Sequence, residues 1–416
     1  MNKEQRLKKR YNAEKRFKLY GLTSILLAIF FVIFLLNAIF SKGSGAFLKT
    51  TIDVEVNFDA DTLELSESPP LEDLENTDYY ELAIDSILKV KKVNGLTEEK
   101  LLINLFSPDY EYEIRNFLLD NPKALNQTTV LKLTASDDFD QLHKGNYPRE
   151  LPEERRRINN FQLNLYDELV NEGKVNKIFN SYLFTKGDSR NPELAGIGGA
   201  LFFTIVITLL LSFPIAIAAS VYLEEFAPKN KITDFIEINI NNLAAVPSIV
   251  FGLLGLGILL GTFHLPRSTP LVAGITLALM TLPRIIIPCR ASLKAVPPSI
   301  REGALAIGAS KVQSVTHHVL PLAIPGTLSG TIIGLAQALG ETAPLILIGM
   351  VAFVVDIPSI PTDPSASLPV QVYLWSEQAE RGFVEKTSAT IMVLLSFLIT
   401  LNFIAVYLRQ KFERKW

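Results

Sequence analysis

The sequence predicts an α-helical integral membrane protein with a soluble α/β domain placed after its first membrane span. Of the 416 residues, 48% are hydrophobic, and the mean hydropathy of +0.26 is high for a soluble protein. The charges are also unevenly divided. Residues 43–190 contain 28 acidic and 17 basic residues, whereas the rest of the chain contains 15 acidic and 23 basic residues. We therefore expect an acidic, water-facing block within a basic, membrane-bound frame.

The first predicted span is Leu22–Phe40, a run of 19 uncharged residues. As a helix it would be about 28 Å long, close to the hydrocarbon thickness of a bilayer. Eight Lys and Arg residues precede it, and Ser41-Lys42-Gly43 offers no convincing cleavage site. The pattern favours an uncleaved anchor whose basic end lies in the cytoplasm.

Five further spans are predicted after the acidic block. The loop of about 289–321 carries four Lys or Arg residues and one acid, so it is expected in the cytoplasm, as are both termini. We thus expect three parts: a basic N-terminus with the first membrane helix (1–42), an acidic periplasmic α/β domain (43–190), and a five-span core (191–416) in the inner membrane. The five spans are Gly198–Leu223, Leu243–Phe263, Leu271–Pro288, Leu322–Phe353 and Ala389–Leu408.

The acidic block is long enough to form its own hydrophobic core. Ile52, Val54, Val56 and Phe58 alternate with polar residues, which is typical of a half-buried strand. Residues 109–119 and 156–170 have the pattern of amphipathic helices. The only cysteine, Cys289, lies outside the block, so no disulfide within the chain is possible. The composition does not indicate what the block does.

The cytoplasmic loop contains the pattern of a short, capped helix. Ser299 and Glu302 have the spacing of a capping box, after Pro297 and Pro298. The loop is either a connector that lies along the membrane surface or a docking element for another protein. Ala304, Leu305, Ile307 and Val312 are expected to form the apolar face of this short helix, with a bend at Gly308. Leu320-Pro321 is expected to open the next membrane span, because proline fits the first turn of a helix.

Glu341 is the only ionisable residue between His318 and Asp356, within an apolar stretch. A carboxylate in a membrane span is costly and is a functional hypothesis by default. Gly340 and Pro344 weaken the helix at this point, and a broken helix at membrane depth is tolerated where it is buried or lines a cavity. Glu341 either pairs with an arginine, Arg284 being the candidate, or belongs to a translocation path. Arg290 is either an ordinary positively charged anchor at the cytoplasmic side of the membrane or part of the translocation path.

Two glycine series predict close helix contacts. Gly326, Gly330 and Gly334 recur every four residues, and Gly257 and Gly261 do the same in the third span. Packing within the chain is the expected role. The four histidines show no metal-ligand spacing, so no metal site is predicted.

The chain resembles the permeases of ABC importers, and more narrowly the PstA-type permeases of phosphate-specific importers. Glu302, Ala304, Gly308, Leu320 and Pro321 match the EAA-loop pattern, from which Gly303 and His318 depart. The narrower resemblance rests on the runs Gly340-Glu341-Thr342-Ala343-Pro344 and Ala245-Val246-Pro247-Ser248-Ile249-Val250-Phe251-Gly252, together with Leu282-Pro283. It covers about half of the chain, and the acidic block looks like an insertion.

The resemblance implies a six-span type I permease core that carries phosphate. Its EAA loop, here Ser299, Arg301, Glu302, Ala304, Gly308, Leu320 and Pro321, would contact an ATP-hydrolysing subunit. The substrate path would include Glu341, Arg284, Thr342 and Arg290. No G-x-x-x-x-G-K-[ST] phosphate loop occurs in the chain, so ATP and Mg²⁺ are expected on partner subunits and not here. The implied partners are a second, PstC-type permease, two PstB-type ATP-binding subunits, a PstS-type phosphate-binding protein and membrane lipid, with no nucleic acid.

Other interpretations stay open at this point. The same mechanism would serve sulfate, molybdate or another oxyanion, since the EAA pattern is shared. A membrane-anchored sensor that uses residues 43–190 is a different class, although only short segments are predicted in the cytoplasm. The role of that block, and whether the permease pair is homo- or heterodimeric, are not decided by the sequence.

Overall fold

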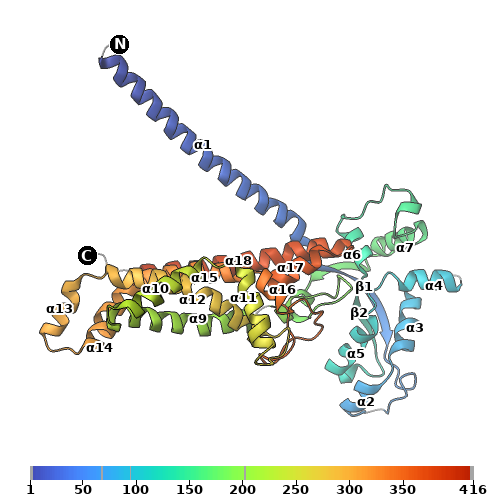
Figure 1. Ribbon diagram of the computed structural model, residues 1–416. Coiled ribbons are helices and arrows are strands. Elements are labelled where there is room, and N and C mark those ends of the chain that lie inside the picture. Colours follow the sequence, from blue (N-terminus) through green and yellow to red (C-terminus); the bar gives the residue numbers. More distant parts are fainter. Residues whose placement is uncertain (1–2, 67–68, 94, 201–202, 413–416) are drawn as a thin grey trace.

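The computed structural model describes residues 3–66, 69–93, 95–200 and 203–412. It consists of an α/β part, a long helical bundle and one helix, α1, that projects away from the bundle (Figure 1). The α/β part lies at one end of the bundle, and the short helices α13 and α14 lie at the other end (Figure 1).

Helix α1 (Lys3–Gly43) contains the first predicted span and has little contact with the rest of the chain. Its apolar side chains are exposed; Phe34, for example, is 64% exposed. Only its last turn packs closely on α18, because a Cβ at Gly43 would lie 2.7 Å from the backbone of Ser388 and Ala389. Such an apolar, unpaired helix needs lipid or another protein around it.

The α/β part is built on a three-stranded antiparallel sheet in the order β2-β1-β3. The central strand β1 (Leu48–Asn57) pairs with β2 (Thr128–Thr134) and with β3 (Val175–Phe179). Around the sheet lie α2 (Leu71–Asn76), α3 (Tyr80–Val90), α4 (Leu96–Ile103), α5 (Tyr110–Asp120), α6 (Asp137–His143), α7 (Asn160–Asn171) and α8 (Tyr182–Thr185), with 3₁₀ turns at Ser44–Phe47, Pro122–Ala124 and Glu153–Arg155.

The predicted strand forms the centre of this part. Ile52, Val54, Val56 and Phe58 are fully buried and form one face of β1 with the residue after it, while Glu55 on the other face is exposed. The two predicted helices correspond to α5 and α7. Helix α7 begins later than expected because Asn159 caps it in a capping box with Gln162.

The bundle is organised around α12 (Pro270–Ala295), which packs against both α9 (Phe203–Val221) and α15 (Leu320–Gly340). Its other elements are α10 (Lys231–Ala244), α11 (Ser248–Leu254), α13 (Pro298–Ala306), α14 (Lys311–Ser314), α16 (Ala343–Leu347), α17 (Leu368–Ser376) and α18 (Arg381–Phe412), the 3₁₀ turn η4 (Gly198–Ala200) and the π-helical segments η5 (Tyr222–Phe226), η6 (Gly255–Leu260) and η7 (Val315–Val319).

Among the described residues, five helical segments are long and apolar enough to cross a membrane, and a sixth is obtained only if a bent pair counts as one span. That pair is α10 and the helix formed by α11 and η6, and the chain bends by 107° between them. The third predicted span, Leu243–Phe263, is therefore wrong as a straight helix, because the chain turns at Ala245–Pro247. The fifth, Leu322–Phe353, ends early, since α15 stops at Gly340 and Glu341 is extended.

One glycine series is confirmed and the other is not. A Cβ at Gly326 or Gly330 would lie 2.1 Å from the Ser292 Oγ or 2.2 Å from the Pro288 Cγ, so this face of α15 lies directly on α12. Gly257 has no described atom near its Cβ position, and Gly261 meets only its own helix.

The α/β part is attached to the start of α18 by buried charges. Glu385 accepts a 2.6 Å hydrogen bond from Gln141 and pairs with Lys144 at 3.2 Å, while Lys144 also pairs with Asp140 at 2.6 Å. Lys386 donates to the carbonyl of Ala195 at 2.7 Å. Since breaking such buried pairs leaves an uncompensated charge, this contact holds the α/β part firmly on the bundle.

Candidate functional site

The two sequence runs that carry the resemblance meet in the bundle. Gly252, which ends one run, lies against Pro344, which ends the other, because a Cβ at Gly252 would be 2.6 Å from the Pro344 Cα. Gly255, one turn later, lies against Thr276 of α12. The close contacts of this region are thus made by Gly252 and Gly255, and not by the predicted Gly257 and Gly261.

Glu341 occupies the break between α15 and α16. It follows the last residue of α15 with extended backbone (φ −79°, ψ 124°), and Thr342 then precedes the short helix α16, where its carbonyl accepts from Ile346 N at 2.9 Å. Glycine at position 340 and proline at position 344 both disfavour a continuous helix here. The break puts the carboxylate of Glu341 on irregular backbone inside the bundle.

Arg284 of α12 is the charged residue that faces Glu341. Its Nη1 lies 3.9 Å from the Glu341 Oε1, and each side chain is 18% exposed. The distance is too long for a direct hydrogen bond, and Nη1 is buried with no hydrogen-bond partner in the described part of the chain. The pair is therefore loose: two opposite charges share one site, and each retains unused hydrogen-bonding capacity.

Arg290 is separate from this pair. It contacts Glu237 of α10 at 2.5 Å and Glu224 of η5 at 3.3 Å, so two carboxylates already neutralise it. This arrangement favours the role of an anchor for Arg290 over a role in the translocation path. Neither Glu224 nor Glu237 was predicted from the sequence as a site residue, although the acidic pair Glu224-Glu225 at the end of an apolar span was an available signal.

The cytoplasmic-loop residues surround α13 and α14. Helix α13 begins at Pro298 with Pro297 as its N-cap, so the predicted cap at Ser299 is wrong: Ser299 lies inside the first turn and is exposed, as is Glu302. The two prolines start the helix before the serine can cap it. A capping box does form one helix later, between Ser310 and Gln313.

Arg301 fixes α13 to the bundle. Its guanidinium binds Glu225 through Nε and Nη2, donates to the carbonyl of Val296 at 2.7 Å and to that of Leu293 at 2.8 Å. Glu225 is only 7% exposed in this pair. Arg301 therefore positions α13 through contacts within the chain itself.

The bend expected at Gly308 is present, with a φ of +93° that suits glycine. Ala304 is buried, whereas Leu305, Ile307 and Val312 are 49%, 82% and 57% exposed. An apolar surface of this kind at the end of the bundle is available for another protein. Leu320 and Pro321 start α15, although the preceding segment η7 already continues the helix from α14.

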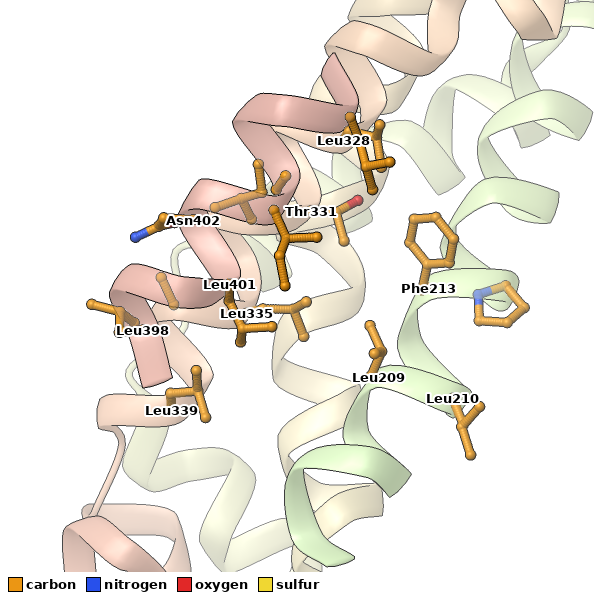
Figure 2. Close-up of a pocket in the computed structure, with 16 residues that line it drawn as sticks. Leu209, Leu210, Phe213, Leu328, Thr331, Leu335, Leu339, Leu398, Leu401 and Asn402 are labelled. Atoms are coloured by element: carbon orange, nitrogen blue, oxygen red, sulfur yellow. The ribbon is translucent and has the colours of Figure 1, made fainter. Parts of the chain in front are cut away.

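A hollow of about 370 Å³ lies among α9, α15 and α18 (Figure 2). Leu209, Leu335 and Leu401 line it, and Thr331 and Asn402 are its only residues with polar side chains among those described. The Thr331 hydroxyl is already used in a bond to the Thr327 carbonyl. An anion finds no charged donor there, so this hollow is distinct from the Arg284–Glu341 site.

Helices long and apolar enough to cross a membrane, a charged pair at a helix break and an exposed apolar loop at one end are features expected of a membrane transport subunit. The chain belongs to the family described as binding-protein-dependent transport system inner membrane component, which matches residues 202–416. A domain of unknown function, DUF3333, matches residues 4–153. That match takes in α1 and most of the α/β part but stops before α7 and β3, which complete it.

Named relatives include a probable ABC transporter permease, YqgI, of Bacillus subtilis, 32% identical over 145 residues, which are 35% of this chain and 49% of the relative. The phosphate transport system permease protein PstA 1 of Mycobacterium tuberculosis is 28% identical over 51% of this chain and 70% of its own length. PstC of Haemophilus influenzae is 29% identical over 47% and 69%. The chain thus spans about half of the first of these relatives and some 70% of the other two.

A solved structure of the MetNI methionine ABC transporter in an inward-facing conformation is 17% identical to the chain, with a TM-score of 0.41. It covers 51% of this chain and 94% of the matched chain. That likeness is too weak to support an argument. The PstA-type resemblance predicted from the sequence is confirmed by the relatives.

Proposed function

We propose that this chain is the transmembrane permease subunit of an ATP-driven importer for inorganic phosphate. The observation that carries the proposal is the loose Arg284–Glu341 pair at the break between α15 and α16, beside the Gly252–Pro344 contact. Support also comes from the phosphate permeases among the relatives. ATP and Mg²⁺ belong to the partner subunits in this proposal, and the chain itself is not an enzyme.

The charged pair suits a protonated anion. Phosphate at neutral pH carries negative charge and still has a proton to donate. Arg284 supplies planar N–H donors that match the phosphate oxygens, and the Glu341 carboxylate accepts a hydrogen bond from the protonated phosphate oxygen. Sulfate has no such proton, so Glu341 repels it. Thr342, beside Glu341, adds a hydroxyl at the same break.

The partners follow from the same proposal. A second, PstC-type permease completes the path. One of the two PstB-type ATP-binding subunits docks on the surface of Leu305, Ile307 and Val312, and a PstS-type phosphate-binding protein delivers the anion from outside. The docking surface and the α/β part lie at opposite ends of the bundle (Figure 1). With the docking surface in the cytoplasm together with both termini, residues 43–190 lie in the periplasm, and lipid surrounds the apolar helices of the inner membrane.

Radiolabelled phosphate uptake tests the cargo. Cells that lack this chain and its paralogues should lose high-affinity phosphate uptake and regain it when the chain is supplied. Excess arsenate should compete with phosphate, because it carries a similar proton, and excess sulfate should not. Competition by sulfate but not by arsenate would instead favour the alternative cargo, a fully deprotonated oxyanion such as sulfate or molybdate.

A further inference from the structure

A polar cavity of about 500 Å³ lies where the α/β part meets the bundle. Its walls come from the end of α4 and the residues that follow, the start of α6, the approach to α7, and residues 190–193 ahead of α9, and Glu380 closes it next to α18. None of the residues of the Arg284–Glu341 site or of the α13–α14 loop lines it. The cavity therefore belongs to neither role proposed above.

The inner wall of the cavity carries two carboxylates without a cation. Glu193 is 6% exposed, and its Oε2 has no hydrogen-bond partner within the part of the chain that the structure describes. Asp137 accepts one long bond, 3.3 Å, from the backbone N–H of Gly382. No described Lys, Arg or His forms an ion pair with either residue. Glu193 is buried and Asp137 is half-buried, and carboxylates in such places are normally paired.

The electrostatics of the wall agree with its geometry. Burial raises the pKa of Asp137 to about 7, and the nearby Glu193 carboxylate adds to the effect. Burial likewise raises the pKa of Glu193 to about 7. The positive charge of Lys386 acts against this rise, but its ammonium donates to the Ala195 carbonyl at 2.7 Å and forms no ion pair with Glu193 among the described residues. Two neighbouring carboxylates thus line the cavity, and no described cation forms an ion pair with either of them.

The whole lining has an excess of negative charge. Its four carboxylates outnumber its two guanidiniums, and both guanidiniums belong to exposed residues at the mouth. Among the described residues, no group of three or more His, Cys, Asp or Glu has the spacing to hold a metal ion. A cation that brings its own hydrogen-bond donors needs no such group of ligands. The charged lining residues are Asp137, Asp138, Glu193, Glu380, Arg157 and Arg190.

We propose that this cavity binds a small primary amine, whose ammonium group lies between Glu193 and Asp137. A primary ammonium has three N–H donors, which satisfy both carboxylates and leave one for a neighbouring amide such as Asn191. Asp137 belongs to α6, Glu193 precedes α9, and the N–H of Gly382 belongs to α18. A bound amine therefore joins the α/β part to the bundle beside the buried pairs of Glu385.

Thermal unfolding of the purified full-length chain in detergent at pH 8 tests the proposal. At that pH both carboxylates are ionised in most molecules. Ethanolamine should raise the melting temperature in a saturable way, whereas tetramethylammonium, a cation of similar size without N–H donors, should not. Glu193→Gln should weaken ethanolamine binding about tenfold or more, and Glu81→Gln, which removes an exposed carboxylate of α3, should leave it unchanged.

Direct titration calorimetry of the wild-type chain with ethanolamine keeps the test decisive if Glu193→Gln does not fold, and Asp137→Asn then serves as the second variant. Equal effects of ethanolamine and tetramethylammonium would show charge screening only and would overturn the proposal. So would the absence of any heat or melting shift with ethanolamine, or unchanged binding in a folded Glu193→Gln chain.

Discussion

Individual glycines decide how closely the helices of the bundle approach one another. At Gly330 the Pro288 ring of α12 occupies the space that a side chain would need, whereas the space beside Gly257 is open among the described residues. The two positions look alike in the sequence, because each belongs to a series with a four-residue repeat. Only one of them is a packing contact.

Gly330→Ala should therefore destabilise the chain, and Gly257→Ala should not. The new Cβ would meet the Pro288 Cγ at 2.2 Å, and a proline ring in a helix cannot move aside. Overpacking of this kind costs about 1–3 kcal/mol, which lowers the melting temperature in detergent by several degrees. Equal melting temperatures for Gly330→Ala and the wild type would contradict the close contact of α15 with α12.

At the scale of an element, α13 is positioned by a single arginine. Arg301 joins this helix to Glu225 at the end of the second span and to two carbonyls at the end of α12. The sequence predicted a docking helix here, but assigned Arg301 to the contact with the partner. Its side chain is turned instead toward its own bundle, which leaves the exposed apolar residues for the partner.

Arg301→Ala should loosen the loop between α13 and α14. Removal of the guanidinium leaves the nearly buried Glu225 without a partner, at a cost of about 1–3 kcal/mol, because the pair is only partly buried. Trypsin should then cut faster after Lys311, whereas Glu302→Ala, a change on an exposed neighbour, should have no effect. The double variant Arg301→Ala/Glu225→Ala should be less sensitive than Arg301→Ala. Identical cleavage rates in all four proteins would exclude a positioning role.

Local patterns predicted a good part of this structure. Hydropathy predicted α1, α9, α12, α15 and α18, because each contains a long apolar run. Alternation predicted β1, because its apolar residues recur at every second position. The bend at Ala245–Pro247 was not predicted, because the hydropathy of an apolar run is the same for a straight helix and for a bent one. Proline at position 247 was the available signal.

Long-range contacts could not be predicted in this way. The hydrogen bond between Gln141 and Glu385 joins residues 244 positions apart, and the local sequence around either residue does not indicate its partner. The same holds for the cavity between Asp137 and Glu193. The pair of Arg284 and Glu341 was proposed from the sequence only because each is an isolated charge in an apolar stretch, where a partner is required.

At the scale of the whole molecule, the proposed function makes one chain a single wall of the phosphate path. The charged pair is partly exposed, the docking surface lies at one end of the bundle and the α/β part at the other (Figure 1). A second permease that faces Arg284 and Glu341 would enclose the anion between two such walls. The buried pairs of Glu385 make the α/β part move with α18 rather than independently of it.

The central claim is that Arg284 and Glu341 contact the transported phosphate. Phosphate uptake by cells whose only copy of the chain is Glu341→Gln or Arg284→Gln tests it most directly, with membrane abundance matched to the wild type by immunoblot and Glu81→Gln as the control. We predict that both variants assemble and lose uptake at least about tenfold, a loss of transition-state or binding energy of about 1.4 kcal/mol or more. Wild-type uptake in both variants would contradict the account.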